Sequence, residues 1–162
     1  MATWSGIRNK LENEYLAHSL RGHIQYFATS YSKCHDHEGR AAIRLDGREM
    51  LSGSYCEQWS KASLLPKDDT LQKRLMFEFP FMDNTALKYG QFDQRCFYRS
   101  FEEFDNQSIE KSLASENMLV RIFALLDRRV GKRRLSKMKL EISGEPEMIQ
   151  LCYDIRANAE KL

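Results

Sequence analysis

The stretch Arg40-Ala41-Ala42-Ile43-Arg44-Leu45-Asp46-Gly47-Arg48-Glu49-Met50-Leu51 decides the fold of the first third of the chain. In its middle, Asp46-Gly47 separates two runs of residues that can form strands. A type I′ turn needs a positive φ at both central residues, and Asp-Gly is among the pairs that best tolerate it. The sequence therefore predicts two antiparallel strands, residues 40–45 and 48–51, joined by a two-residue turn.

The residues before this hairpin predict a helix and one more strand. Apolar side chains recur at spacings of three and four, which is typical of a helix with one apolar face, at Trp4, Ile7, Leu11 and Tyr15. We expect this helix to span residues 4–20, with Thr3 or Ser5 as its cap and Gly22 after its end. Residues 22–31 then change to the alternation of a strand. The chain up to residue 54 is thus predicted to be a helix followed by a three-stranded antiparallel meander.

The second part of the chain, residues 55–162, is predicted to be mainly helical. Apolar residues with helical spacing predict a short helix near Trp59, a helix carrying Phe97, Phe101 and Phe104, and further helices over residues 108–115, 117–130 and from Met148 to the end. Asp93 is a possible cap of the aromatic-rich helix. We expect Phe97, Phe101 and Phe104 to be core residues, because platforms for stacking bases are usually exposed sheet positions. The fold class is therefore predicted as α+β, with residues 1–162 in a single domain.

Composition limits the kind of protein. A chain of 162 residues with 42% hydrophobic and 30% charged residues is typical of one globular domain. Neither a signal peptide nor an apolar run of about 18 residues is present, so we expect no membrane partner. The four cysteines lack a C-x-x-C pair and predict reduced thiols in the cytoplasm.

Positive charge is concentrated in one segment. Residues 120–139 contain eight Lys or Arg and one acidic residue, a local charge of +7, so the rest of the chain carries −5 of the total of +2. Such asymmetry predicts a basic surface on a mildly acidic body. The candidate binding residues are Arg121, Arg128, Arg129, Lys132, Arg133 and Arg134.

The segment has two interpretations. In a continued helix Arg128 and Lys132 would share one row and Arg129 and Arg133 another, and four phosphate contacts would give a salt slope of about −3.6. Alternatively, cations in the last turn of a helix ending at Gly131 would complement the helix dipole and form internal ion pairs.

Two groups of residues contain the side-chain types that bind metals. Cys34-His35-Asp36-His37 contains residue types that bind zinc, and His18 and His23 are possible further ligands, but no second cluster follows at zinc-finger spacing. For a metal-dependent nuclease, the carboxylates would be Glu12 or Glu14, Asp36 or Asp46, and Glu49. Glu49 lacks the lysine two positions later that such sites commonly use, and Asp46 is explained by the turn. We predict neither a metal nor another cofactor, and no catalytic residue.

The chain resembles a family of small bacterial proteins described as conserved hypothetical. The resemblance covers most of the chain and rests above all on Ala124-Leu125-Leu126 with the following Asp-Arg-Arg-x-Gly-Lys-Arg element. The residues that carry it are Trp4-Ser5, Ser19-Leu20-Arg21-Gly22, Thr29-Ser30-Tyr31, Ser108-Ile109-Glu110 and Asp127-Arg128-Arg129-Val130-Gly131-Lys132-Arg133. It implies a bacterial cytoplasmic protein and no particular activity.

The sequence thus favours a non-enzymatic cytoplasmic binding module whose basic surface contacts a nucleic acid or an acidic protein. One alternative is a metal-dependent phosphodiesterase or nuclease that uses the carboxylates named above. A further alternative is an immunity-like or antitoxin-like module, whose acidic remainder would bind a basic protein. The sequence favours no oligomeric state.

Overall fold

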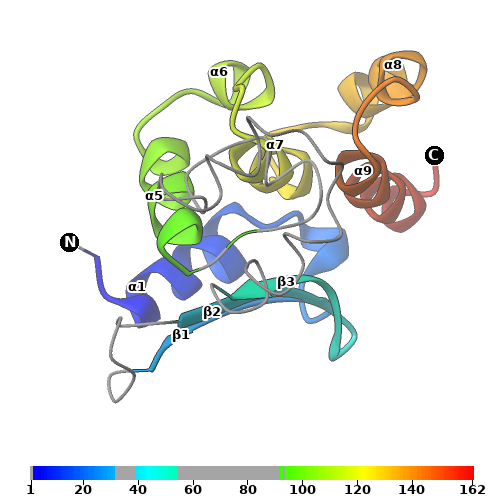
Figure 1. Ribbon diagram of the computed structural model, residues 1–162. Coiled ribbons are helices and arrows are strands. Elements are labelled where there is room, and N and C mark those ends of the chain that lie inside the picture. Colours follow the sequence, from blue (N-terminus) through cyan, green and yellow to red (C-terminus); the bar gives the residue numbers. More distant parts are fainter. Residues whose placement is uncertain (1, 32–38, 55–91, 93) are drawn as a thin grey trace, which may run out of the picture.

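The computed structural model describes residues 2–31, 39–54, 92 and 94–162 (Figure 1). The helix predicted near Trp59, the cap predicted at Asp93 and the possible ligands of residues 34–37 lie outside the described residues. In the described part, an N-terminal helix precedes three strands, and helices follow. The predicted α+β class is confirmed.

The three strands form an antiparallel sheet in the order β1-β2-β3. They are β1 (Ile24–Ser30), β2 (Gly39–Leu45) and β3 (Arg48–Ser54). The turn between β2 and β3 has φ 49° at Asp46 and φ 80° at Gly47, as a type I′ turn requires. Tyr26 pairs with Ile43, which in turn pairs with Leu51. These three side chains lie on the buried face of the sheet, so the predicted hairpin and meander are confirmed.

The N-terminal helix is shorter than predicted. It consists of α1 (Trp4–Asn9) and a π-helical continuation η1 (Lys10–Tyr15), and η2 (His18–Leu20) is a separate 3-10 turn. Thr3 is the cap, and its Oγ1 accepts a hydrogen bond from the backbone N–H of Gly6 at 3.3 Å. A single helix over residues 4–20 was wrong because Leu16 leaves the helix and forms a bridge with Asp127.

The described stretch of the second part, residues 94–162, is mainly helical, as predicted. Its helices are α5 (Gln94–Asp105), α6 (Ile109–Leu113), α7 (Met118–Leu126), α8 (Lys132–Ile142) and α9 (Glu147–Glu160). Ser108 caps α6 through a hydrogen bond from Lys111 N–H, and Asn117 caps α7 through bonds from the N–H groups of Leu119 and Val120. No helix within these described ranges has the length and apolar character needed to cross a membrane.

Helix α7 lies at the centre of the core (Figure 1). It contacts α5 on one side and α9 on the other, and its Phe123 ring lies 5.2 Å from the Phe97 ring and 5.8 Å from the Tyr26 ring, centroid to centroid. Phe97, Phe101 and Phe104 of α5 are all buried. The prediction that these aromatic residues form core rather than an exposed stacking platform is confirmed.

Candidate functional site

The basic segment of the sequence forms a turn between two helices. Helix α7 ends at Leu126, Asp127 is extended with φ −78° and ψ 139°, and α8 begins after Gly131. A single helix over residues 117–130 was therefore wrong, and so was the continued helix with two rows of cations. We call residues 127–134 the basic turn; it comprises the residues between the helices and the first turn of α8.

The carboxylate of Asp127 stabilises the sharp change of direction. Its Oδ1 accepts a hydrogen bond from the backbone N–H of Arg129 at 2.7 Å, the geometry by which an aspartate replaces a helical bond with a local turn. On the other side, the N–H of Arg128 donates to the Tyr15 carbonyl at 2.7 Å, and the N–H of Ala17 donates to the Leu126 carbonyl at 2.9 Å. The turn is thus fixed by its own side chain and by the N-terminal segment.

Arg156 of α9 holds the same turn from inside the protein. This arginine is 3% exposed, and its guanidinium donates to the carbonyl oxygens of Leu126 at 3.3 Å, Asp127 at 3.2 Å and Val130 at 2.9 Å. It also forms an ion pair with Glu160 at 3.1 Å. Burial lowers the pKa of Arg156 below its ordinary value. Arg156 therefore satisfies carbonyl groups that the break in the helix leaves free.

Arg129 is a structural residue. Its guanidinium forms an ion pair at 2.7 Å with Asp127, and the Asp127 side chain has no exposed surface. It also lies 4.8 Å above the centroid of the Tyr15 ring and 5.5 Å above that of Phe104. The hydrogen bonds to Asp127 raise the pKa of Arg129. Its charge is compensated within the fold and contributes little to an external surface.

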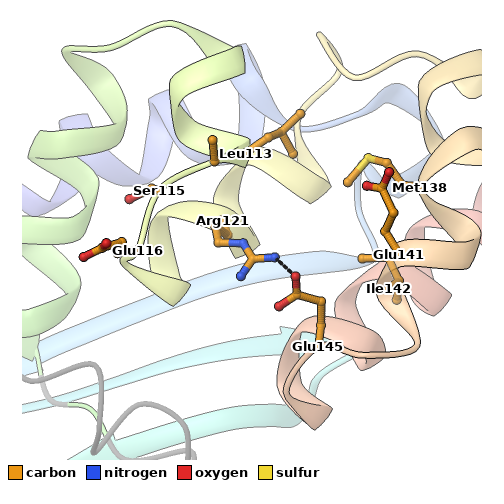
Figure 2. A pocket seen from close by; sticks show the side chains of 9 residues that line it. Leu113, Ser115, Glu116, Arg121, Met138, Glu141, Ile142 and Glu145 are labelled. Atoms are coloured by element: carbon orange, nitrogen blue, oxygen red, sulfur yellow. Dashed lines mark ion pairs between the residues drawn. The ribbon is translucent and has the colours of Figure 1, made fainter.

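Three more of the six predicted binding residues are in ion pairs. Arg121 contacts Glu145 at 2.5 Å (Figure 2), and Arg134 contacts Glu110 at 3.3 Å. Lys132 lies 3.7 Å from the Glu160 carboxylate and donates to the Glu160 carbonyl at 3.0 Å. The sequence predicted the positions of these cations but could not show their acidic partners, which lie in α6, in α9 and in the loop between α8 and α9.

Arg128 and Arg133 differ from the other four. They are exposed, as are Arg129 and Lys132, but neither has an ion pair or side-chain hydrogen bond with the described part of the chain. Arg133 stands with Lys132 in the first turn of α8, where the helix dipole is positive. The alternative that these cations occupy the last turn of a helix was therefore wrong. Each cation at such a position costs about 0.3–1 kcal/mol, so the dipole gives no reason for their presence.

The carboxylates of the nuclease alternative have separate partners. Glu12 accepts a hydrogen bond from the Tyr26 N–H at 2.8 Å, Asp46 lies 2.6 Å from His23 Nδ1, and Glu49 binds Arg40 and Arg44. Asp36 lies outside the described residues. Across residues 2–31, 39–54, 92 and 94–162, no three His, Cys, Asp or Glu side chains come together as a possible metal site.

The pairing of Glu49 predicts how acid affects stability. Hydrogen bonds from Arg40 and Arg44 lower the pKa of Glu49 from 4.5 to about 2. The pair therefore stabilises the fold fully above pH 4.5, and this contribution is lost as the pH falls towards 2. We expect Glu49→Gln to lower the free energy of unfolding by about 1 kcal/mol at pH 7, because solvent screens this partly exposed pair.

Urea unfolding of both proteins at pH 7, 4 and 2 measures this contribution. The difference should be largest at pH 7 and disappear near pH 2. Glu102→Gln changes an exposed glutamate with no ion pair among the described residues, and it should stay within about 0.5 kcal/mol of the parent protein. A constant difference at all three pH values would show that Glu49 does not act through its charge.

Comparison with curated proteins and with solved structures gave no match. A sequence model of the SF0329 protein family matches residues 3–157. The match includes the basic turn, the N-terminal segment that bonds to it, and Arg156. The chain belongs to the SF0329 protein family.

Proposed function

We propose that the protein is a non-enzymatic binding module whose basic turn holds an anionic partner, preferably the phosphate backbone of a nucleic acid. The observation that carries the proposal is the pair Arg128 and Arg133, which are exposed and lack an acidic partner within the described residues. Most of their basic neighbours are ion-paired. An anionic ligand would supply the partner that the fold does not.

The basic turn is suited to such a ligand because its backbone is fixed in advance. Asp127, Arg156 and the Tyr15 carbonyl hold the turn through hydrogen bonds of 2.7–3.3 Å. A fixed backbone reduces the conformational entropy that a ligand must remove when it binds. The first turn of α8 adds N–H groups and the positive end of its dipole to the two arginine charges, and phosphates favour both.

The structure changes the expected salt dependence. Arg129 is bonded to a buried carboxylate and Arg134 to Glu110, so neither is free to neutralise a phosphate. Two contacts, from Arg128 and Arg133, give a slope of log K against log salt of about −1.8 on duplex DNA, and a third contact from Lys132 gives about −2.7. Both slopes are shallower than the slope of about −3.6 for four phosphate contacts.

Charge reversal tests the proposal. We expect Arg128→Glu with Arg133→Glu to weaken binding of labelled duplex and single-stranded DNA and RNA more than tenfold at low salt, because each lost charge-assisted contact is worth about 1.5–3 kcal/mol. Fluorescence anisotropy at two salt concentrations measures both the affinity and the slope. The matched control is Arg48→Glu with Lys139→Glu, which makes the same change in net charge at exposed positions outside the basic turn.

The control separates local contact from overall charge. Equal losses in both double variants would mean that net charge alone attracts the nucleic acid, and the proposed surface would be wrong. The parent protein could instead fail to bind nucleic acids but bind labelled polyglutamate, with the affinity lost in Arg128→Glu with Arg133→Glu. That result would identify the partner as an acidic protein. Cleavage of the labelled strand on addition of Mg²⁺ would support the nuclease alternative instead. The cytoplasm remains the predicted place of action.

A further inference from the structure

A cavity lined by acidic and apolar residues, unlike the basic turn, lies between α6 and α8. It has a volume of about 420 Å³, and Leu113, Met138 and Ile142 form the apolar part of a mixed lining. Figure 2 shows Met138 and Glu141 of α8 across from Leu113 and Glu116, with Arg121 of α7 between them. Ligand sites in proteins commonly measure about 300–1,000 Å³. The cavity is thus large enough to receive side chains from another molecule.

Two ion pairs connect the elements that form this cavity. Arg121 of α7 bonds to Glu145 at 2.5 Å. Arg134 of α8 bonds to Glu110 of α6 at 3.3 Å, one helical turn before Met138 on one wall and Leu113 on the other. Two of the residues predicted for the basic surface therefore belong to this cavity instead. Arg121 lies inside the cavity, and Arg134 connects its walls.

The charge of the cavity is negative. Its lining includes three carboxylates, Glu116, Glu141 and Glu145, and one guanidinium, that of Arg121. Only Glu145 among these carboxylates is in an ion pair within the described part of the chain. Glu116 and Glu141 are exposed on opposite walls. A cation placed between the walls would be attracted from both sides.

We propose that this cavity binds a basic segment of a protein partner, with lysine or arginine beside apolar residues. A lysine or arginine side chain combines an apolar stem with a charged end. In this cavity the stem would pack on Leu113, Met138 and Ile142, while the charged end would reach Glu116 or Glu141. An acidic partner is disfavoured by the carboxylates, and a wholly apolar one would leave them without a counter-charge.

The test uses a fluorescein-labelled peptide of alternating lysine and leucine. We expect saturable binding by fluorescence anisotropy at low salt, and at least fivefold weaker binding to Glu116→Gln with Glu141→Gln. The matched control, Glu102→Gln with Asp154→Asn, removes two charges at exposed positions outside the cavity, and it should bind like the parent protein. Circular dichroism and thermal unfolding confirm that both double variants fold.

Two further measurements locate the peptide and identify what it needs. In a methyl-labelled protein, the Met138 resonance, assigned with Met138→Leu, should shift as the peptide is added. A peptide with glutamine in place of lysine, and spermidine alone, should each bind at least fivefold more weakly than the lysine-leucine peptide. The proposal is wrong if the parent protein does not bind the peptide, if the two double variants lose affinity equally, if Met138 does not respond, or if spermidine binds as tightly.

Discussion

Replacing Arg156 by methionine is expected to lower the free energy of unfolding by about 3–5 kcal/mol, as when one partner of a buried charge pair is removed. The guanidinium supplies the hydrogen bonds to the carbonyls of Leu126, Asp127 and Val130. Methionine fills a similar volume but donates no hydrogen bond, so these carbonyls would lose a partner in a buried place. Glu160 would also lose its contact at 3.1 Å. Urea unfolding at pH 7 measures the change.

Two control variants separate the causes. Arg156→Lys keeps the charge but not the planar donor group, and we expect it to recover only part of the lost stability, because lysine cannot reach three carbonyls in a fixed geometry. Arg128→Met makes the same chemical change at an exposed position and should stay within about 0.5 kcal/mol of the parent. A loss below about 1 kcal/mol in Arg156→Met would mean that the turn does not depend on this arginine.

The variant also connects stability with the proposed function. The Tyr15 carbonyl accepts a hydrogen bond from the backbone N–H of Arg128. The Arg156 guanidinium donates to the carbonyl of the preceding residue, Asp127. If Arg156→Met leaves the protein folded at low temperature, we expect weaker nucleic-acid binding although no charge of the surface itself has changed. Arg128→Met should also weaken binding, but it should leave the stability unchanged. The two variants thus distinguish a positioning residue from a contact residue.

The sheet could be predicted from the sequence because its information is local. Asp46-Gly47 determines the turn through the φ angles that it tolerates, and the turn determines the pairs next to it, Leu45 with Arg48 and Arg44 with Glu49. Beyond them a shift of register, which the sequence did not predict, pairs Ile43 with Leu51. Helices α5, α6, α7 and α9 were likewise predicted from apolar residues at helical spacing, since an amphipathic pattern repeats within each helix. Helix α8 was not predicted as a separate helix. The caps at Thr3, Ser108 and Asn117 follow the same local chemistry.

The helix ends could not be predicted because distant residues determine them. Tyr15 and Leu16 stop the first helix by bonding with Arg128 and Asp127, more than a hundred positions away in the sequence. The apolar pattern of α7 continues to Val130, which is buried although it lies beyond the helix. Hydrophobic periodicity indicates which residues are buried, and here the buried residues continue beyond the end of the helix.

The candidate site was predicted in part for a similar reason. The cluster of positive charge was visible in the sequence, but its acidic partners were not. Four of its six members form ion pairs, one with Asp127 of the basic turn and three with residues outside it, Glu110, Glu145 and Glu160. One missed residue did leave a signal. Arg156 falls on the same helical stripe as Met148 and Cys152, which are buried. An arginine on an apolar stripe indicates a buried charge with a structural role.

Phe123→Ala is expected to have an effect as large as that of Arg156→Met, by a different cause. The Phe123 side chain is 2% exposed, and its ring contacts those of Tyr26, Phe97 and Phe104 at centroid distances of 5.8, 5.2 and 5.6 Å. It therefore joins the sheet, α5 and α7 in one cluster. Removing the ring leaves a cavity among these elements, and such substitutions cost about 3–5 kcal/mol.

Thermal unfolding should show this loss as a fall in Tm of about 6–20 °C, given about 2–4 °C per kcal/mol at this chain length. Phe123→Leu keeps most of the volume, so we expect a smaller loss, of about 1–2 kcal/mol. The control Leu140→Ala removes an apolar side chain that is 88% exposed and should change stability by less than about 0.5 kcal/mol. Equal effects of Phe123→Ala and Leu140→Ala would contradict the central position of α7, because only a buried ring leaves a cavity when it is removed.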